Sequence, residues 1–276
     1  MISLFRLRTA KAIKAKYRGT EKREKEIELI KAQRDVLKGS KEKIEFDSTF
    51  WKLSKTQLKK ESFGKCAYCE ANTEVVAHGD VEHYRPKSIY WWLSYTYDNY
   101  LYACQICNQI YKSDNFPING IRFPEPQVSA YSTEDEIKLL VKNISPDPID
   151  VNANYTLQTY LQKHYDEQAY LLNPYFDNPE NYIAYEADDV LEEVKIVPQS
   201  PDLQPYIKAM EDFYGINRIE LKSVRYGIFR LFRAFKKALP HITHAPTQKE
   251  VIEQIDFMKA DKSLFAGMVR YFDAIL

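Results

Sequence analysis

The four cysteines of the chain form two pairs, each with two residues between its members. Cys66-Ala-Tyr-Cys69 is followed, 34 residues later, by Cys104-Gln-Ile-Cys107. Two such pairs supply four thiolates, the ligand set with which zinc forms closed tetrahedral structural sites. A redox function for one Cys-x-x-Cys motif is the alternative, but it leaves the second pair unexplained. We therefore predict a structural Zn²⁺ bound by Cys66, Cys69, Cys104 and Cys107.

The segment between the two pairs contains residues suited to acid–base and metal chemistry. In Asp80-Val-Glu-His-Tyr-Arg-Pro-Lys-Ser88, His83 can accept a proton from water, because imidazole is largely neutral near pH 7. Glu82, and Asn108 after the second pair, offer the oxygen ligands that Mg²⁺ or Mn²⁺ prefers. Asp80 is the alternative ligand, since alternation along a strand places it on the face of Glu82. A base, a metal and a rigid frame together suit hydrolysis of a phosphodiester.

Three cationic residues accompany this segment. Arg85 and Lys87 are candidate contacts to nucleic-acid phosphates, with solvated surface residues as the alternative. Lys112 lies one helical turn after Asn108, where its ammonium would face a phosphate or the leaving oxygen. The residues that we predict to contact nucleic acid are therefore Arg85, Lys87 and Lys112.

The order and spacing of these residues resemble those of a known enzyme family. Glu82-His83 precedes Arg85-Pro86-Lys87, Asn99 follows His83 by sixteen residues, and Asn108 follows nine residues later within Cys-x-x-Cys-Asn-x3-Lys. Over about residues 64–118 the chain resembles the HNH nucleases, whose ββα-metal core often carries a pair of zinc knuckles. The resemblance implies a catalytic set of His83, Asn99, Asn108 and Lys112. It also implies that His83 activates water, that Glu82 and Asn108 hold Mg²⁺ or Mn²⁺, and that Asn99 braces the β-ribbon through backbone hydrogen bonds.

Segments outside this core resemble one HNH subgroup. They are Phe5-Arg-Leu-Arg8, Leu171–Glu180 followed by a hairpin, and Tyr214–Leu221 with Arg225. The subgroup includes the nuclease component of Septu-type anti-phage systems and similar nucleases attached to some retrons. The resemblance implies an effector nuclease of a defence complex that works beside an ATPase of the ABC/SMC-like class, with DNA favoured over RNA as substrate. A zinc-organised binding or adaptor module without catalytic activity is the alternative function.

The elements that must position these residues divide the chain into three regions. We predict an α+β fold in which a ββα-metal HNH core with a structural zinc is embedded in a mainly α-helical protein. The expected regions are a basic helical region over residues 1–62, the zinc module over 63–120, and a mainly helical region with a short hairpin over 121–276. Helices are expected over about 21–38, 48–62, 151–170, 201–239 and 247–275, and hairpin strands over 182–185 and 190–197.

Composition restricts the possible functions. The chain has 276 residues, 45% of them hydrophobic, which is enough to bury a core. No apolar stretch is long enough to span a membrane, and the basic N-terminus lacks the apolar core of a signal peptide. No glycine-rich phosphate loop is present, which excludes nucleotide-driven chemistry of that type. We therefore expect a cytoplasmic protein without a membrane partner.

The net charge of zero hides an uneven distribution. Residues 1–65 contain 19 Lys and Arg against 9 Asp and Glu, a formal charge of +10, and the rest of the chain carries −10. A second basic segment lies in the expected helix around residues 214–239, and it is either a solvated face or a track for phosphates. The neutral total predicts weak non-specific DNA affinity, with targeting supplied by the basic flanks or by a partner.

Overall fold

The computed structural model describes residues 1–73, 79–153 and 155–276. Helices dominate, and the described strands form two small antiparallel sheets, so the chain mixes helix and sheet. The α-helices are α1 (Gly19–Leu37), α2 (Ser48–Lys52), α3 (Lys55–Glu61), α4 (Glu134–Val141), α5 (Leu157–Glu167), α6 (Gln204–Tyr214), α7 (Ile219–Ala238), α8 (Ala245–Lys259) and α9 (Ala266–Ile275). The strands are β1 (Asp80–His83), β2 (Tyr100–Ala103), β3 (Ile183–Asp188) and β4 (Glu193–Pro198).

Single-turn helices and a short π-helix join these elements. Within the described residues, none of the helices is both long and apolar enough to cross a bilayer. The short helices are η1 (Ala15–Tyr17), η2 (Trp91–Leu93), η3 (Tyr97–Asn99), the π-helix η4 (Ile106–Lys112), η5 (Pro179–Asn181), η6 (Pro201–Leu203) and η7 (Leu239–His241).

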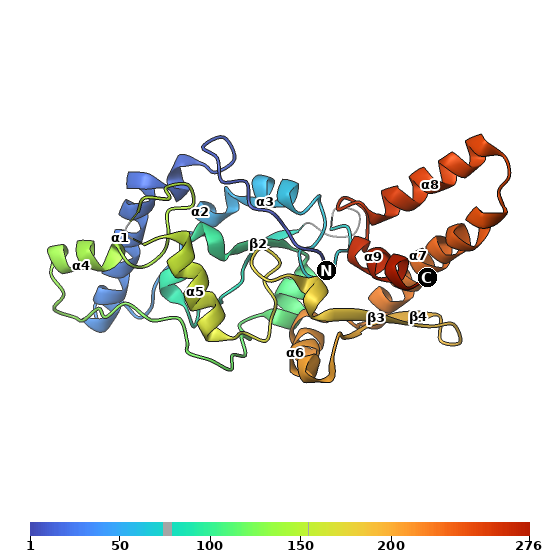
Figure 1. Cartoon of the computed structure of the whole chain (residues 1–276). Helices are drawn as coiled ribbons and strands as arrows, with labels where there is room; N and C mark the ends of the chain where they lie inside the picture. The colour runs from blue at the N-terminus through green and yellow to red at the C-terminus, as the bar shows by residue number, and fades with distance from the viewer. Residues whose placement is uncertain (74–78, 154) are drawn as a thin grey trace.

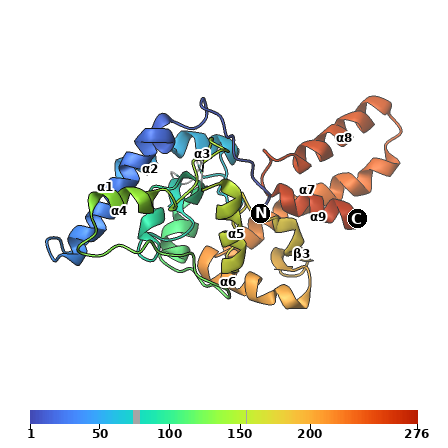
Figure 2. The same cartoon turned by 60° about the vertical axis from the view of Figure 1, so that its left-hand side comes forward.

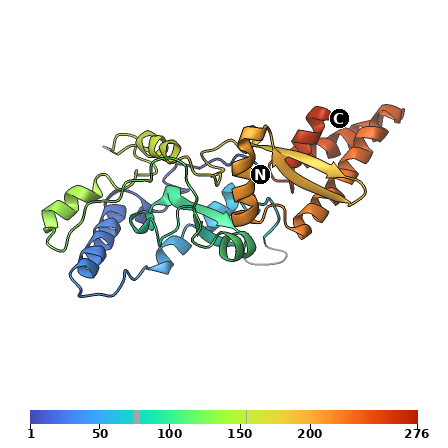
Figure 3. The same cartoon turned by 90° about the horizontal axis from the view of Figure 1, so that it is seen from below.

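The molecule is elongated, with the β1–β2 ribbon near its middle (Figure 1). Helices α1 and α4 lie side by side at one end, and α7, α8 and α9 gather at the other end beside the β3–β4 hairpin, as the rotated view in Figure 2 also shows. Seen from below in Figure 3, α6 lies between the central ribbon and the β3–β4 hairpin. The predicted active segment is thus in the centre, between two helical ends.

The ribbon and the π-helix after it form the frame of the central region. Strands β1 and β2 pair antiparallel, with Asp80 opposite Ala103 and His83 opposite Tyr100. Every residue of β2 is buried, because α2 and α3 pack against the ribbon. The chain then turns through the second cysteine pair into η4, against which α6 packs. A π-helix in this place is notable, because such helices occur often at functional sites.

Tyrosines make up much of the core. The chain has 21 tyrosines. Four of them are almost completely buried, namely Tyr17, Tyr84, Tyr100 and Tyr214. A buried hydroxyl needs a hydrogen-bond partner. Here the hydroxyls donate to backbone carbonyls, as from Tyr100 to Ser94 at 2.7 Å. These rings therefore fill the interior and fix loops.

The helix predicted over residues 48–62 is two helices in the structure. Asp47 starts α2 by accepting a hydrogen bond from the Thr49 amide at 3.0 Å. The Ser54 hydroxyl then donates to the Trp51 carbonyl at 2.6 Å and competes with the helical hydrogen bond of that carbonyl. The chain bends at Leu53–Ser54 and restarts as α3. The bend lets α2 pack on β1 while α3 contacts both strands.

Gly215 fixes the contact between α6 and η4. It ends α6 with a positive φ of 61°, a conformation that favours glycine. A Cβ at this position would lie 2.5 Å from the Tyr111 ring of η4, which is too close for any side chain. The glycine thus allows both the helix end and the close approach of α6 to the π-helix.

Candidate functional site

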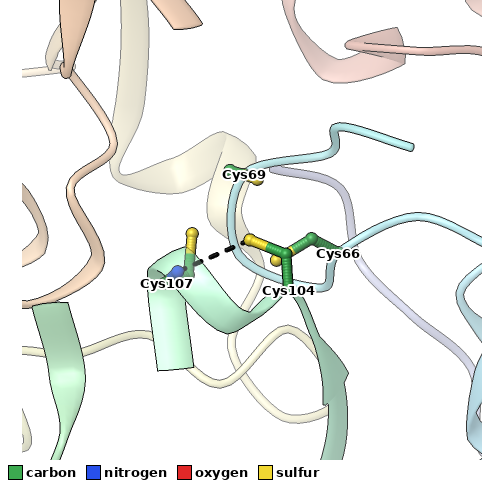
Figure 4. Close-up of side chains that lie close together, drawn as sticks. All are labelled: Cys66, Cys69, Cys104 and Cys107. Atoms are coloured by element: carbon green, nitrogen blue, oxygen red, sulfur yellow. Dashed lines mark hydrogen bonds between the residues drawn. The ribbon is translucent and has the colours of Figure 1, made fainter. Parts of the chain in front are cut away.

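The four cysteines meet at one point. Cys66 and Cys69 come from the loop after α3, Cys104 follows β2 directly, and Cys107 lies in the first turn of η4 (Figure 4). All four are buried, and their Sγ atoms lie within 4.8 Å of one another. Four sulfurs bound to one zinc at 2.3 Å would be roughly 3.8 Å apart, so the cluster needs little contraction. The donor set and its spacing therefore fit a zinc ion.

Arg218, at the start of α7, contacts this cluster. One of its terminal nitrogens donates to the Cys107 Sγ at 3.5 Å and the other to the Cys69 Sγ at 3.9 Å. The neighbouring sulfurs raise the pKa of the Arg218 guanidinium against the effect of burial, so the group stays charged. Four thiolates around one Zn²⁺ carry a net charge of −2, which a nearby cation stabilises. Arg218 thereby ties the C-terminal region to the cysteine cluster.

A pocket of about 290 Å³ opens where β1, η4 and α2 meet. Its wall includes four of the residues singled out from the sequence, namely Glu82, His83, Lys87 and Asn108. The complete lining is Trp51, Val81, Glu82, His83, Pro86, Lys87, Asn108, Gln109, Ser113 and Asp114.

His83 is buried in the pocket wall with one ring nitrogen engaged. Its side chain lies edge-on to Trp51, with ring centroids 4.9 Å apart, and 6% of the residue surface is exposed. The Nε2 atom lies 3.0 Å from the Ser94 carbonyl oxygen. A carbonyl can only accept, so Nε2 carries the proton and Nδ1 keeps its lone pair. Burial, with Lys87 nearby, lowers the pKa of His83 to about 3, so the ring is neutral at pH 7.

Glu82 is held in place from behind the pocket. Its carboxylate pairs with the ammonium of Lys112 at 2.7 Å, and Lys112 also donates to the His83 carbonyl at 3.1 Å. Burial raises the pKa of the Glu82 carboxyl, while the Lys112 charge opposes that rise. Asp80, the alternative ligand, does not line the pocket, and its carboxylate accepts from Gln109 at 2.7 Å. Of the two acidic residues of β1, Glu82 is therefore better placed than Asp80 to bind a metal ion in the pocket.

Lys112 therefore has a different role from the one predicted. We expected its ammonium to reach a phosphate or a leaving oxygen. In the structure its exposed fraction is 0%, and its donors point to Glu82 and to the β1 backbone. The reason is that side chains of η4 bond to β1, Lys112 to Glu82 and His83 and Gln109 to Asp80, so Lys112 faces inward. Lys112 is a positioning residue that fixes the Glu82 carboxylate.

Asn99 braces the turn that follows β1. Its Oδ1 accepts from the Arg85 amide at 2.8 Å, and its Nδ2 donates to the Arg85 carbonyl at 3.0 Å. The side chain is fully buried and has no path to a substrate. Two hydrogen bonds to one residue fix the backbone just after His83, so Asn99 positions the site from inside the protein.

The structure places Arg85 differently from the sequence-based prediction. It was expected to contact nucleic acid, but its exposed fraction is 0%. Its guanidinium pairs with Glu167 of α5 at 2.7 Å and donates to the Tyr160 hydroxyl at 3.3 Å. It also donates to His164 Nδ1 at 3.1 Å. A buried cation with this many partners cannot turn toward a phosphate without leaving Glu167 uncompensated.

Replacing Arg85 with methionine should destabilise the fold. The change leaves the Glu167 carboxylate buried without its cation, a loss that commonly costs about 3–5 kcal/mol. Urea unfolding would measure the difference in the free energy of unfolding. Lys87→Met is the matched control, because Lys87 is half-exposed and is expected to change that free energy by less than about 1 kcal/mol. If the Arg85→Met protein kept its stability but lost affinity for DNA, the prediction that Arg85 contacts nucleic acid would be restored.

The pocket also contains residues that the sequence did not indicate. Trp51 lies 32 positions before His83 and reaches the pocket through the packing of α2 on β1. Ser113 and Asp114 line it because η4 ends there, with Ser113 at a positive φ of 45°. Lys87 lies near the Trp51 ring, with its ammonium 5.4 Å from the ring centroid. A local motif could not identify Trp51, since nothing in its own segment carries metal or acid–base chemistry.

Comparison with known proteins gives one partial relative. Over 79 residues the chain is 37% identical to the Septu protein PtuB of Bacillus mycoides. The match covers 24% of this chain and 27% of that protein, so it spans about a quarter of the relative's length. No protein-family model matches the chain, and no solved structure does. Part of the chain is therefore related to a Septu protein.

Proposed function

We propose that the chain is a metal-dependent endonuclease of the HNH type that hydrolyses phosphodiester bonds, with DNA favoured over RNA. The observation that carries the proposal is the pocket in which Glu82, His83 and Asn108 converge beside the cysteine cluster. The ribbon, the π-helix and the four sulfurs form one rigid frame around it. The partial similarity to a Septu protein supports a role as the effector of an anti-phage defence complex.

Each residue of the pocket would have a defined task. His83 Nδ1 takes a proton from the attacking water, because Nε2 is already donating to Ser94. The water oxygen bonds to phosphorus as the bond to the leaving sugar oxygen breaks, and solvent protonates that oxygen. Glu82 and Asn108 would hold Mg²⁺ or Mn²⁺, which neutralises charge on the phosphate and on the leaving oxygen.

The donors around the pocket fit such a cation. Glu82 is ion-paired with Lys112 on one side, and the Asn108 side chain has no hydrogen-bond partner among the described residues. An unpaired amide oxygen beside a carboxylate is a hard oxygen pair of the kind that Mg²⁺ takes, with water completing its shell. Lys112 would keep Glu82 in one orientation and ionised.

A partner would supply the trigger. The chain has no glycine-rich phosphate loop of its own. The resemblance to Septu-type and retron-associated nucleases implies an ATPase of the ABC/SMC-like class beside it. We propose that this ATPase controls the access of the pocket to DNA.

The test combines metal binding with cleavage. Titration of the zinc-loaded protein with Mn²⁺ is expected to show a second binding event, and plasmid should be cut with Mn²⁺ or Mg²⁺ and spared with EDTA. Glu82→Gln should weaken Mn²⁺ binding by about 10-fold or more, because it removes the anionic ligand. Glu250→Gln, an exposed substitution of the same kind on α8, is the control.

A protein that binds no second metal ion and leaves plasmid and total RNA intact, also beside its ATPase, would contradict the proposal. That result would instead favour the zinc-organised adaptor module. Loss of Mn²⁺ binding in Asp80→Asn but not in Glu82→Gln would reassign the ligand on β1.

A further inference from the structure

We infer that helices α2 and α3 are the surface that holds the sugar–phosphate backbone of duplex DNA next to the pocket. This inference rests on the proposed function, and it names the surface that brings the substrate to the site. Residues 48–62 contain four lysines, Lys52, Lys55, Lys59 and Lys60, against one acidic residue, Glu61. Glu61 does not offset them at the surface, since it is buried and paired with Arg6 at 3.1 Å.

Three lysines of this surface reach solvent and keep their charge available. Lys52 and Lys60 are exposed and Lys55 is half-exposed, whereas Leu58 and Glu61 form the buried face of α3. Over residues 1–73, 79–153 and 155–276, Lys52, Lys55 and Lys60 form no ion pair. A cluster of unneutralised cations creates a local positive potential that attracts a polyanion.

The surface lies at the edge of the pocket. Trp51, which immediately precedes Lys52, lines the pocket and packs edge-on against His83. Helix α2 packs on β1, and α3 lies along the ribbon beside β2 (Figures 1 and 2). Lys87, whose ammonium lies 5.4 Å from the Trp51 ring centroid, brings a further cation to the same opening. A backbone bound along α2 and α3 would therefore run toward Glu82 and His83.

The other basic helix is a weaker candidate, because acidic side chains neutralise it. On α7, Lys222 pairs with Glu193 at 2.5 Å, Arg233 with Asp189 at 2.8 Å, and Lys236 with Asp273 at 2.9 Å. Arg230 also faces Glu192, at 3.5 Å. Helix α7 lies at the end of the molecule away from α1 and α4, beside the β3–β4 hairpin that supplies several of these acids (Figure 1). Ion pairs within the protein thus engage these basic residues, which neither a freely solvated face nor a track for phosphates would require.

The chemistry of α2 and α3 fits a duplex backbone. Their exposed side chains are lysines and two threonines, residue types that contact phosphates, and the aromatic Phe50 is buried. Proteins that hold single strands present exposed aromatic side chains on which bases stack. Within the described part of α2 and α3, no aromatic side chain is fully exposed. Binding through such phosphate contacts alone would therefore not depend on the base sequence of the DNA.

The test is DNA binding in EDTA, where cleavage cannot occur. A labelled DNA duplex is titrated at 50–200 mM salt with the wild-type chain and with the triple variant Lys52→Gln/Lys55→Gln/Lys60→Gln. We expect the triple variant to bind about 10- to 100-fold more weakly, and its slope of log K against log salt to fall in magnitude by about 2–3. The matched control is Arg230→Gln/Arg233→Gln/Lys236→Gln, which changes the charge equally and should retain wild-type affinity and slope.

The outcomes separate this surface from the proposed activity. Equal affinity of the two triple variants, a stronger loss in the α7 variant, or no binding of duplex by the wild type would overturn the inference. Preference for a duplex RNA competitor over duplex DNA would also overturn it as stated. A protein that binds duplex through these lysines but cuts nothing with Mn²⁺ would retain the surface and contradict the nuclease proposal alone.

Discussion

A His83→Ala protein is expected to lose cleavage of plasmid by about 10²- to 10⁴-fold, the range that a general base commonly contributes. The structural reason is the protonation of its ring. Nε2–H donates a hydrogen bond to the Ser94 carbonyl, so the lone pair of Nδ1 is the basic site, and burial keeps the ring neutral at pH 7. Initial rates of plasmid nicking with saturating Mn²⁺ would measure the loss.

A buried histidine also contributes to packing, so the loss must be assigned to chemistry. His241→Ala, the same substitution at an exposed position, is the matched control and should keep the wild-type rate. Added imidazole should restore part of the His83→Ala activity, because it can replace the missing base and cannot repair a misfolded frame. Full cleavage by His83→Ala, with unchanged zinc content, would exclude His83 as the base.

Cys104→Ser should abolish stoichiometric zinc binding and unfold the region around the ribbon. Zinc binding by small four-ligand sites contributes about 10–16 kcal/mol, while whole domains are stable by only about 5–15 kcal/mol. The four cysteines join the loop after α3 to the start of η4, and strand β1, which supplies part of the pocket wall, lies between the two pairs in the sequence. Zinc content by metal analysis and the thermal unfolding midpoint would both fall sharply.

The control for this prediction is an adjacent residue of the same turn. Gln105→Ala removes an exposed side chain beside Cys104 and should leave zinc content and the unfolding midpoint close to wild type. Removal of zinc from the wild type by a strong chelator should reproduce the Cys104→Ser behaviour. A folded Cys104→Ser protein with full zinc content would show that the cluster does not require all four sulfurs.

Some features of this molecule could be predicted from short stretches of sequence. The two Cys-x-x-Cys pairs indicated one four-sulfur site, and the four sulfurs do meet within 4.8 Å. Helices and the C-terminal hairpin were also predicted near their observed places, because hydrophobic periodicity and turn residues are local signals, although the helices expected over 201–239 and 247–275 are each divided, into α6 and α7 and into α8 and α9. The bend within residues 48–62 was missed, since the Ser54 hydroxyl bond to Trp51 forms only in the folded chain.

Burial and partner choice could not be predicted in this way. Arg85 and Lys87 are two residues apart and carry the same charge, yet Arg85 pairs with Glu167 in the interior while Lys87 lines the pocket. The difference arises from α5, which is far away in sequence and supplies a buried carboxylate for one of them only. In the same way, acids from the β3–β4 hairpin and α9 neutralise α7, whereas Lys52, Lys55 and Lys60 of α2 and α3 have no acidic partner among the described residues.

The sequence by itself therefore determined the chemistry available to this protein. It supplies four thiolates, the imidazole of His83, and carboxylate and amide oxygens at a spacing suited to metal binding. Only the tertiary structure decided which side chains face the pocket, which brace it from behind, and which cations remain free for a partner. The physical reason is that residue type and short-range spacing fix which groups can bind or transfer protons. Solvent exposure and ion pairing depend on contacts between segments distant in the chain.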